Sequence, residues 1–335
     1  MTKLRILRSA SRCIYENLAL EDYLFRNLEE GEEALLLWRN RDCVVLGRYQ
    51  NPYIECRLGK LRRDGISLAR RQSGGGAVWH DEGNLCFTFF RSRPGPGQSF
   101  SRRDTVELTA RALAGLGVPA EINRRLDILA EGCKISGSAF RESRGRSFHH
   151  GTILIQSNLD KLKSYLEPLP PRSAAGFSGR GIRSLVSPVR NIGPYLQTGH
   201  AVEAVEAALA AAFVRLRSPA APPESRSGPA VETADPRTIG EPAFRAYLER
   251  LQSRDWLYGA SPPFSRRCRL GRFDCTLDIR GGLIADLRIA EAGETDPGET
   301  EDAPPDGTGD LLAGPDPDRL SAEELRNLLL GREYG

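Results

Sequence analysis

The stretch RRQSGGGAVWHDEGN, residues 70–84, sets three consecutive glycines between two arginines and a short apolar segment. Glycine reaches positive φ and carries no Cβ, so such a run brings the backbone close to a ligand. Its successive amide N–H groups can form an anion-binding concavity, next to the charges of Arg70 and Arg71. The stretch lacks the GK[ST] of a P-loop and the GxGxxG of a dinucleotide-binding turn. On its residues alone it indicates either a phosphate site or, as is more common for a glycine run, a flexible turn.

The same stretch contains His80 and Asp81, which together resemble a catalytic His–Asp pair. Adjacent residues of a strand point to opposite faces, so the two side chains are not expected to act on one substrate atom. We predict that they fix the turn through hydrogen bonds.

A second chemistry-bearing stretch is CKISGSAF, residues 133–140, which follows a short apolar strand and a Glu-Gly turn. It contains Lys134, one of only five lysines among 47 Lys and Arg residues. The small neighbours of Lys134 let a ligand approach, and a compact ammonium suits a carboxylate or phosphoester oxygen on which charge develops. The alternative is an ordinary surface lysine.

Two further stretches suggest walls of a binding pocket. In SFHHGTILIQ, residues 147–156, the adjacent His149 and His150 are poorly spaced to hold one metal, so we expect no zinc site and predict a pocket wall beside Gly151 and Thr152. The Gly- and Arg-rich segment Ser178–Asn191 is either a mobile loop that closes over an anionic ligand or a solvated loop.

The totals describe an ordinary globular protein. A chain of 335 residues can bury a full core and is expected to form two domains. The net charge of +3 implies neither a nucleic-acid nor a membrane partner. Seven cysteines without CxxC pairs indicate reduced thiols in a cytoplasmic protein. The basic first dozen residues weakly resemble a transit peptide, but we favour a first strand at LRIL.

The apolar periodicity predicts two domains of mixed α/β structure. Residues 1–217 are expected to form the large domain, 218–236 a Pro- and Ala-rich linker, and 237–335 a small C-terminal α+β accessory domain. An acidic, Pro-rich loop near residues 291–310 is expected to be mobile.

The expected elements of the first domain are a helix at Tyr15–Leu28, a strand pair within Ala34–Arg48, strands at Asn84–Phe90 and Gly151–Gln156, and helices at Thr105–Gly117 and Ala201–Leu216. Those of the second are a helix at 243–252, a hairpin about Arg280–Gly282 and a last helix capped by Ser321.

Taken in order, RRQSGGGAVWHDEGN, KISGSAF, FHHGTILI and GIRSLVSPVRN closely resemble the motifs of the bacterial lipoate–protein ligase A family. NLALEDYLFR, LWRNRDCVVLGRYQNPYIEC and WLYGASPPFS extend the resemblance over most of the chain, most weakly in the linker and beyond about residue 290. The resemblance implies a catalytic domain like those of biotin ligase and class II aminoacyl-tRNA synthetases, with a small C-terminal domain.

The resemblance also implies a two-step reaction. Lipoate and ATP, with Mg2+ on the nucleotide, give lipoyl-AMP and pyrophosphate; the lipoyl group then passes to a lysine of a lipoyl domain. The implied partners are apo E2 subunits of 2-oxoacid dehydrogenases and the glycine-cleavage H protein, with lipoate or octanoate as the acid. No metal held by protein ligands is implied.

Family roles fall on a defined set of residues. Lys134 would be catalytic, contacting both the lipoate carboxylate and the phosphate ester oxygen. The residues implied to bind the nucleotide or line the same pocket are Arg71, Gly75, Gly76, Ala77, Val78, Trp79, Asp127, Gly151 and Thr152. Trp79 is bulkier than the expected Phe or Tyr, so its contact is expected to be through the backbone.

Two alternatives remain at this point. A transferase of the same fold would move acyl groups from lipoyl-AMP or another carrier, possibly through a thioester on Cys133 or Cys86. A non-catalytic protein would only bind lipoate or its carriers. A biotin ligase is disfavoured because the GRGRxG-like signature is absent.

Overall fold

The computed structural model describes residues 3–92, 102–166, 176–217, 230–291 and 319–332. Its first elements are β1 (Lys3–Ser9), α1 (Ile14–Asn27), β2 (Glu32–Trp38), β3 (Cys43–Leu46), α2 (Pro52–Glu55), α3 (Leu58–Arg63), β4 (Ser67–Arg70), β5 (Val78–His80), β6 (Asn84–Ser92), α4 (Arg102–Ala114), β7 (Ala120–Ile122), β8 (Ile128–Ala130), β9 (Cys133–Ser143) and β10 (Arg146–Leu154). There follow α5 (Leu159–Leu166), β11 (Phe177–Gly179), η1 (Gly193–Tyr195), α7 (Ala201–Arg217), β12 (Val231–Ala234), η3 (Pro236–Thr238), α8 (Pro242–Gln252), η4 (Asp255–Gly259), β13 (Phe264–Leu270), β14 (Phe273–Arg280), β15 (Leu283–Glu291) and α9 (Ala322–Leu329).

An eight-stranded mixed sheet forms the centre of the molecule, in the order β12-β1-β2-β6-β10-β9-β8-β7. β1 runs parallel to β2 and β12, and the other neighbours are antiparallel. All of β2 is buried, as is nearly all of β6, because both faces of the sheet are covered. The mixed α/β class predicted from the sequence is confirmed.

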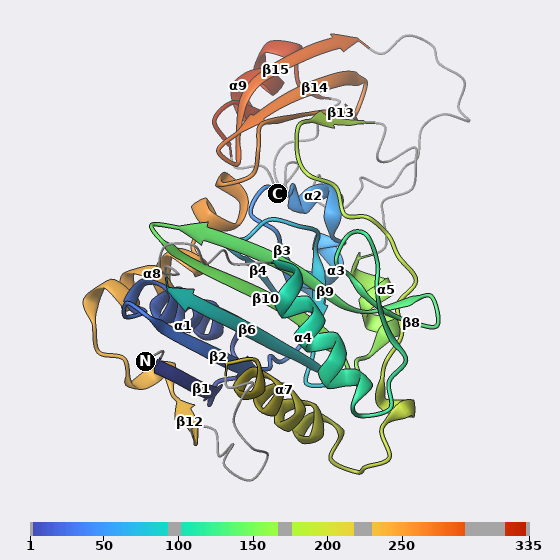
Figure 1. The fold of residues 1–335 in the computed structure, drawn as a ribbon. Coiled ribbons are helices and arrows are strands. Elements are labelled where there is room, and N and C mark those ends of the chain that lie inside the picture. The colour runs from blue at the N-terminus through green and yellow to red at the C-terminus, as the bar shows by residue number, and fades with distance from the viewer. Residues whose placement is uncertain (1–2, 93–101, 167–175, 218–229, 292–318, 333–335) are drawn as a thin grey trace.

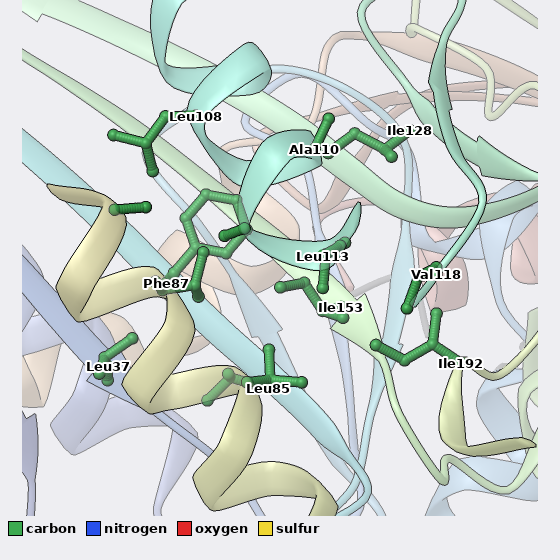
Figure 2. Packing of buried hydrophobic residues seen from close by; sticks show 14 of the residues in the cluster. Leu37, Leu85, Phe87, Leu108, Ala110, Leu113, Val118, Ile128, Ile153 and Ile192 are labelled. Atoms are coloured by element: carbon green, nitrogen blue, oxygen red, sulfur yellow. The ribbon is translucent and has the colours of Figure 1, made fainter. Parts of the chain in front are cut away.

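Helices cover the two faces of this sheet (Figure 1). α4 and α7 pack on one face, where Figure 2 shows Phe87 of β6 in one cluster with Leu108 and Leu113 of α4. α1 lies on the other face with α8 packed against it. The strands supply both layers by alternation: Leu35 and Leu37 face α4 and α7, whereas Leu36 faces α1.

Two smaller sheets complete the fold. β4-β3-β5 form one, and β11-β13-β14-β15 form another, on which α9 packs. The strand pair expected within Ala34–Arg48 is therefore wrong as a pair. β2 and β3 both form, but β2 already has β1 and β6 as neighbours, so β3 joins another sheet.

Several local predictions are confirmed. β14 and β15 are joined by Gly281 and Gly282, both with positive φ, as the hairpin signal indicated. Ser321 caps α9, and Glu324 completes a capping box. β10 begins at Arg146, earlier than expected, because its whole length pairs with β6.

The segment 218–236, which the sequence predicts as a linker, contains a strand of the large sheet. Val231–Ala234 forms β12, which extends the large sheet beside β1, and the following helix α8 packs on α1. Residues 218–229 lie outside the described residues, as does the acidic loop at 291–310 apart from Glu291. The division into domains at residues 217 and 237 stays a prediction. Among the described residues, no helix has the length and apolarity needed to span a bilayer.

The sequence suggested that Arg70 supplies charge for a phosphate, but its side chain is buried and joins separate segments through hydrogen bonds. Its guanidinium donates to the carbonyls of Gly47, Arg48 and Gln50 and, from the other side, to Trp256 and Leu257. Burial lowers its pKa to about 10, so the group stays charged at neutral pH. This contact ties β4 to the turn after β3 and to η4.

Replacing Arg70 by Met should lower the free energy of unfolding by about 3 kcal/mol, because several buried carbonyls lose their donor. Urea denaturation measures the change. Arg63→Met, at an exposed position on α3, is the matched control and should stay within about 0.5 kcal/mol of the wild type. Equal losses in the free energy of unfolding of the two variants would contradict this structural role of Arg70.

Candidate active site

A cavity of about 310 Å³ lies where the large sheet meets the β4-β3-β5 sheet. It brings together nine of the predicted residues: Arg71, Gly75, Gly76, Ala77, Val78, Asp127, Lys134, Gly151 and Thr152. The remaining lining residues are Leu18, Trp38, Val45, His80, Cys86, Arg125, Gly137, Ser138, Ala139, His150, Ile182, Arg183, Ser184, Leu185 and Ser187.

The cavity runs across the sheet along a row of paired residues. Gly137 of β9 pairs with Thr152 of β10, Thr152 with Cys86 of β6, and Cys86 with Trp38 of β2. Three strand spacings make this row about 14 Å long. Lys134 lies at the β9 end, and at the β2 end the lining is mainly apolar, with Leu18 among its residues and the His80 ring beside Trp38. The sequence could not list this apolar end because its members come from different strands and α1.

Lys134 is held by a tight hairpin. Glu131 and Gly132 form a two-residue turn between β8 and β9 with positive φ at both positions. The Nζ atom lies 2.7 Å from Oδ1 of Asp127, and the side chain is 29% exposed. A Cβ at residue 137 would come within 2.8 Å of Lys134 Cε, so Gly137 makes room for the side chain to lie over it.

Asp127 lies in the turn before β8 rather than within the strand. Its backbone N–H donates to Asn123 Oδ1, and its Oδ2 atom accepts from Asn123 Nδ2 at 3.2 Å. Arg125 Nε is 3.4 Å from the same oxygen. Asp127 is thus a fixed carboxylate that positions the Lys134 ammonium.

Arg71 holds the glycine run in place through hydrogen bonds to its carbonyls. Its Nη2 donates to the carbonyls of Gly74 (2.6 Å) and Gly76 (2.8 Å), and Nη1 donates to Val45 O. Burial lowers the pKa of Arg71 to about 10, so it remains a cation. These contacts direct the carbonyls of Gly74 and Gly76 towards Arg71, so that backbone amides of the run are available to a ligand in the cavity.

The middle glycine needs both its conformation and its lack of a side chain. Gly75 has φ +90°, and a Cβ there would lie 2.9 Å from Arg71 Nη2. Its carbonyl oxygen packs so closely on Gly47 that a Cβ at residue 47 would lie 2.0 Å from it. Among the described residues, the amides of Gly74, Gly75 and Gly76 have no protein acceptor. Gly47 was missed from the sequence; its only signal was a glycine ending an apolar strand.

The segment expected to be either a closing or a solvated loop lies against the cavity. Ser184 Oγ accepts from the amide of Ala77 at 2.9 Å, and the Ser184 amide donates to the buried Glu55 at 2.9 Å. At its other end the segment pairs with Lys134, whose N–H donates to Pro188 O at 2.8 Å. The loop therefore forms a wall of the cavity and occupies the amide of Ala77, which directly follows the glycine run.

Trp79 is not among the residues that line the cavity. Its indole is buried, stacks on Tyr165 at 5.2 Å between ring centroids, and donates to Asp81 Oδ2. Asp81 also accepts from Ser157 and from the amide of Gly83, so it fixes the turn as predicted. His80 shares a hydrogen bond with Asn40 instead, outside this turn, so the prediction is confirmed for Asp81 and wrong for His80. The two side chains do not pair with each other, as expected for adjacent strand residues.

Gly151 and the adjacent histidines serve different faces of β10. A Cβ at residue 151 would meet the ring of Phe87 at 2.5 Å, so this glycine admits a core phenylalanine beside the cavity wall. His150 lines the cavity, as the sequence suggested for this strand. His149 is buried on the other side and stacks on Phe140 at 4.3 Å.

A metal held by the protein alone has few ligands to use here. The described residues include no group of three or more His, Cys, Asp and Glu that could hold an ion. Asp127 is the carboxylate in the cavity lining and could add one oxygen to a Mg2+ that is held mainly by phosphates.

The buried histidines predict loss of stability in acid. Burial lowers the pKa of His80 to about 3 and that of His149 well below its usual 6.5. The unfolded chain therefore takes up protons below about pH 6.5 that the folded chain refuses, so stability is full above that pH and falls as the pH drops.

His149→Leu should reduce this pH dependence by up to about 1.4 kcal/mol per pH unit between pH 6 and 5, measured by urea denaturation at each pH. Neither ring nitrogen of His149 has a hydrogen-bond partner within the part of the chain that the structure describes, so the substitution breaks no polar contact there. The exposed His200→Leu is the control. An unchanged slope in His149→Leu would contradict the assignment.

Comparisons with known proteins identify the family of this chain. The family model "Lipoyl protein ligase A/B catalytic domain" matches residues 13–214. Lipoate-protein ligase A of Psychrobacter cryohalolentis is 36% identical over 86% of this chain and 83% of its own length. The structure of P. falciparum LipL1 with lipoate has 25% identity and a TM-score of 0.63, covering 85% of this chain and 84% of that one.

A further structure, a lipoate-protein ligase A bound with ATP, shares the fold with a TM-score of 0.58 at 23% identity, and covers 77% of this chain and 98% of its own. The family match spans more than half of the chain, and the curated relative aligns over nearly all of it. The chain therefore belongs to the lipoyl protein ligase A/B family.

Proposed function

We propose that this protein is an ATP-dependent lipoate–protein ligase, which makes lipoyl-AMP and then lipoylates a lysine of a carrier domain. The observation that carries the proposal is the position of Lys134. Its ammonium stands at the polar end of a cavity that has an apolar far end and a glycine run on one wall. Such a cavity suits an acid with a long apolar tail that must meet a nucleotide at its carboxylate.

In the first step, a carboxylate oxygen of lipoate attacks the α-phosphorus of ATP, and the bond to pyrophosphate breaks. Two anions must approach each other, so the reaction needs positive charge between them. Lys134 supplies it as a compact ammonium with three donors, of which Asp127 uses one. The free amides of the glycine run add donors for phosphate oxygens. Mg2+ bound to ATP would neutralise further phosphate charge.

In the second step, the amine of the acceptor lysine attacks the acyl carbonyl, and AMP leaves. The acyl-adenylate is already activated, so the protein needs no nucleophile of its own, and catalysis rests on positioning and electrostatics. The Lys134 ammonium is then placed to stabilise the oxyanion that forms on the carbonyl.

The acyl chain would lie along the row from Gly137 to Trp38. The row is about 14 Å long, and its far end is lined by Leu18, Val45 and Cys86 as well. This length and polarity suit lipoate or octanoate, with the carboxylate at Lys134. The same proposal assigns apo E2 subunits and the H protein as acceptors and a cytoplasmic location, in keeping with seven cysteines that are all free.

The thioester alternative receives no support from the cysteines. Cys86 lines the cavity, but burial raises the pKa of its thiol well above 9, so it is a poor source of thiolate. Cys133 precedes Lys134 on β9 and is not among the residues that line the cavity.

Lys134→Ala should lower the rate of pyrophosphate release at least about 10²- to 10³-fold, because the charge between the two anions is lost. The assay mixes enzyme, lipoate, ATP, Mg2+ and an apo lipoyl domain, and follows pyrophosphate and the mass of the domain. Lys134→Arg should also be severely impaired, since a planar guanidinium does not fit over Gly137 as the ammonium does.

The control is Lys161→Ala, which removes an exposed ammonium paired with Asp42, and it should leave the rate unchanged. A wild type that binds ATP and lipoate but never shifts the mass of the domain would refute the ligase proposal. Normal turnover by Lys134→Arg would refute only the point-charge account.

Cys86→Ala and Cys133→Ser should both retain ATP-dependent lipoylation within about threefold of the wild type, because no thioester forms on either sulfur. The mass shift of the lipoyl domain measures this. A loss of more than 100-fold in Cys133→Ser, with lipoyl-AMP still formed, would instead favour the transferase route.

A further inference from the structure

A buried chain of hydrogen bonds lies directly behind the glycine run. Ser73 Oγ is 2.6 Å from His150 Nε2, and His150 Nδ1 is 2.8 Å from Glu21 Oε1. Ser73 precedes the three glycines, His150 is on β10 and Glu21 is on α1, so three distant segments meet here. The exposed fractions are 2%, 7% and 3%, respectively.

We infer that Glu21, His150 and Ser73 are positioning residues, which act through Arg71 to hold the glycine run in the form that presents its amides to the reactants. The inference rests on the proposed function for what those reactants are. The connecting contact is the 3.0 Å hydrogen bond that Arg71 Nε donates to Ser73 Oγ.

The direction of each hydrogen bond follows from the groups at the two ends. Arg71 has only donors, so Ser73 Oγ accepts from it and gives its own hydrogen to His150 Nε2. In the neutral tautomer of His150 that fits both contacts, the proton lies on Nδ1 and is donated to the Glu21 carboxylate.

The carboxylate end is fixed by further donors. Thr88 Oγ1 donates to the same Glu21 oxygen at 2.7 Å, and it accepts from Trp38 Nε1 at 3.1 Å. Trp38 also lines the far end of the cavity. With all these groups buried, a break at any link leaves a polar atom without a partner, which makes the arrangement rigid.

The constellation has the order of a Ser–His–acid triad, but the surroundings of Ser73 exclude a nucleophile. Ser73 is not among the residues that line the cavity, and one lone pair of its oxygen is taken by Arg71. The chain ends on Arg71, and Arg71 binds the carbonyls of Gly74 and Gly76. The hydrogen bonds from Glu21 through His150 and Ser73 to Arg71 therefore help to fix the position of the glycine run.

The test compares Ser73→Ala, Glu21→Leu, which removes the acceptor oxygen for His150 and Thr88, and the double variant in pyrophosphate release at saturating ATP and lipoate, normalised to folded enzyme. Each single variant should lose about 10-fold in kcat, since a small displacement of the amides misplaces the phosphate, with the KM for lipoate within about twofold. The double variant should also lose about 10-fold, because both changes cut one chain. Ser73→Thr keeps the hydroxyl and should recover most of the rate.

Asp22→Asn is the matched control. Asp22 follows Glu21 on α1, is 4% exposed, and pairs with Arg26 and Arg141 outside this chain of contacts. Its effect on kcat should multiply with that of Ser73→Ala. The positioning role is refuted if the losses in kcat caused by the Glu21 and Ser73 substitutions also multiply in the double variant. It is refuted as well if Ser73→Ala keeps the wild-type kcat.

A second measurement needs no turnover. The 15N spectrum of labelled histidine should show neutral His150 protonated on Nδ1 and bare on Nε2. Protonation on Nε2 would overturn the chain even if the enzyme is active. A wild type that releases no pyrophosphate would refute the proposed function and leave this spectroscopic test standing.

Discussion

The contact between the Lys134 ammonium and the Asp127 carboxylate fixes the polar end of the cavity, and the proposed chemistry depends on it. Lys134 Nζ lies 2.7 Å from Asp127 Oδ1, and the two residues are joined by a hairpin with a two-residue turn. This short connection restrains the positions of both side chains. Gly137 leaves space for the lysine stem, and the segment at Pro188 pairs with the Lys134 backbone. In the proposed reaction, an ammonium held this way would lie where the carboxylate and the phosphate meet.

The protein uses its two kinds of cation differently. Arg70 and Arg71 are buried, and their guanidinium groups donate mainly to backbone carbonyls. These hydrogen bonds join separate segments and orient the glycine run. Lys134 is partly exposed and keeps donors for a ligand. A guanidinium suits the first task and a point charge suits the second. This explains why a chain so poor in lysine has one among small residues in the cavity.

Local signals were readable from the sequence, and long-range ones were not. Positive φ in the glycine run and in the Gly281–Gly282 hairpin, the cap at Ser321, and the lysine in KISGSAF each depend on a few neighbouring residues. By contrast, the packing of Gly47 against Gly75, the row from Gly137 to Trp38, and the pairing of β12 with β1 join segments far apart in the chain. Arg70 was misassigned for the same reason: two of its carbonyl partners, Trp256 and Leu257, belong to η4, and Leu257 is 187 residues away.

The most direct test of the central claim is a crystal structure of the protein with a non-hydrolysable analogue of lipoyl-AMP. The account predicts Lys134 Nζ within about 3.2 Å of both the acyl carbonyl oxygen and an oxygen of the phosphate mimic, with the dithiolane at the Trp38 end of the row. An analogue bound elsewhere, or bound in the cavity with Nζ beyond hydrogen-bond reach of both oxygens, would contradict it.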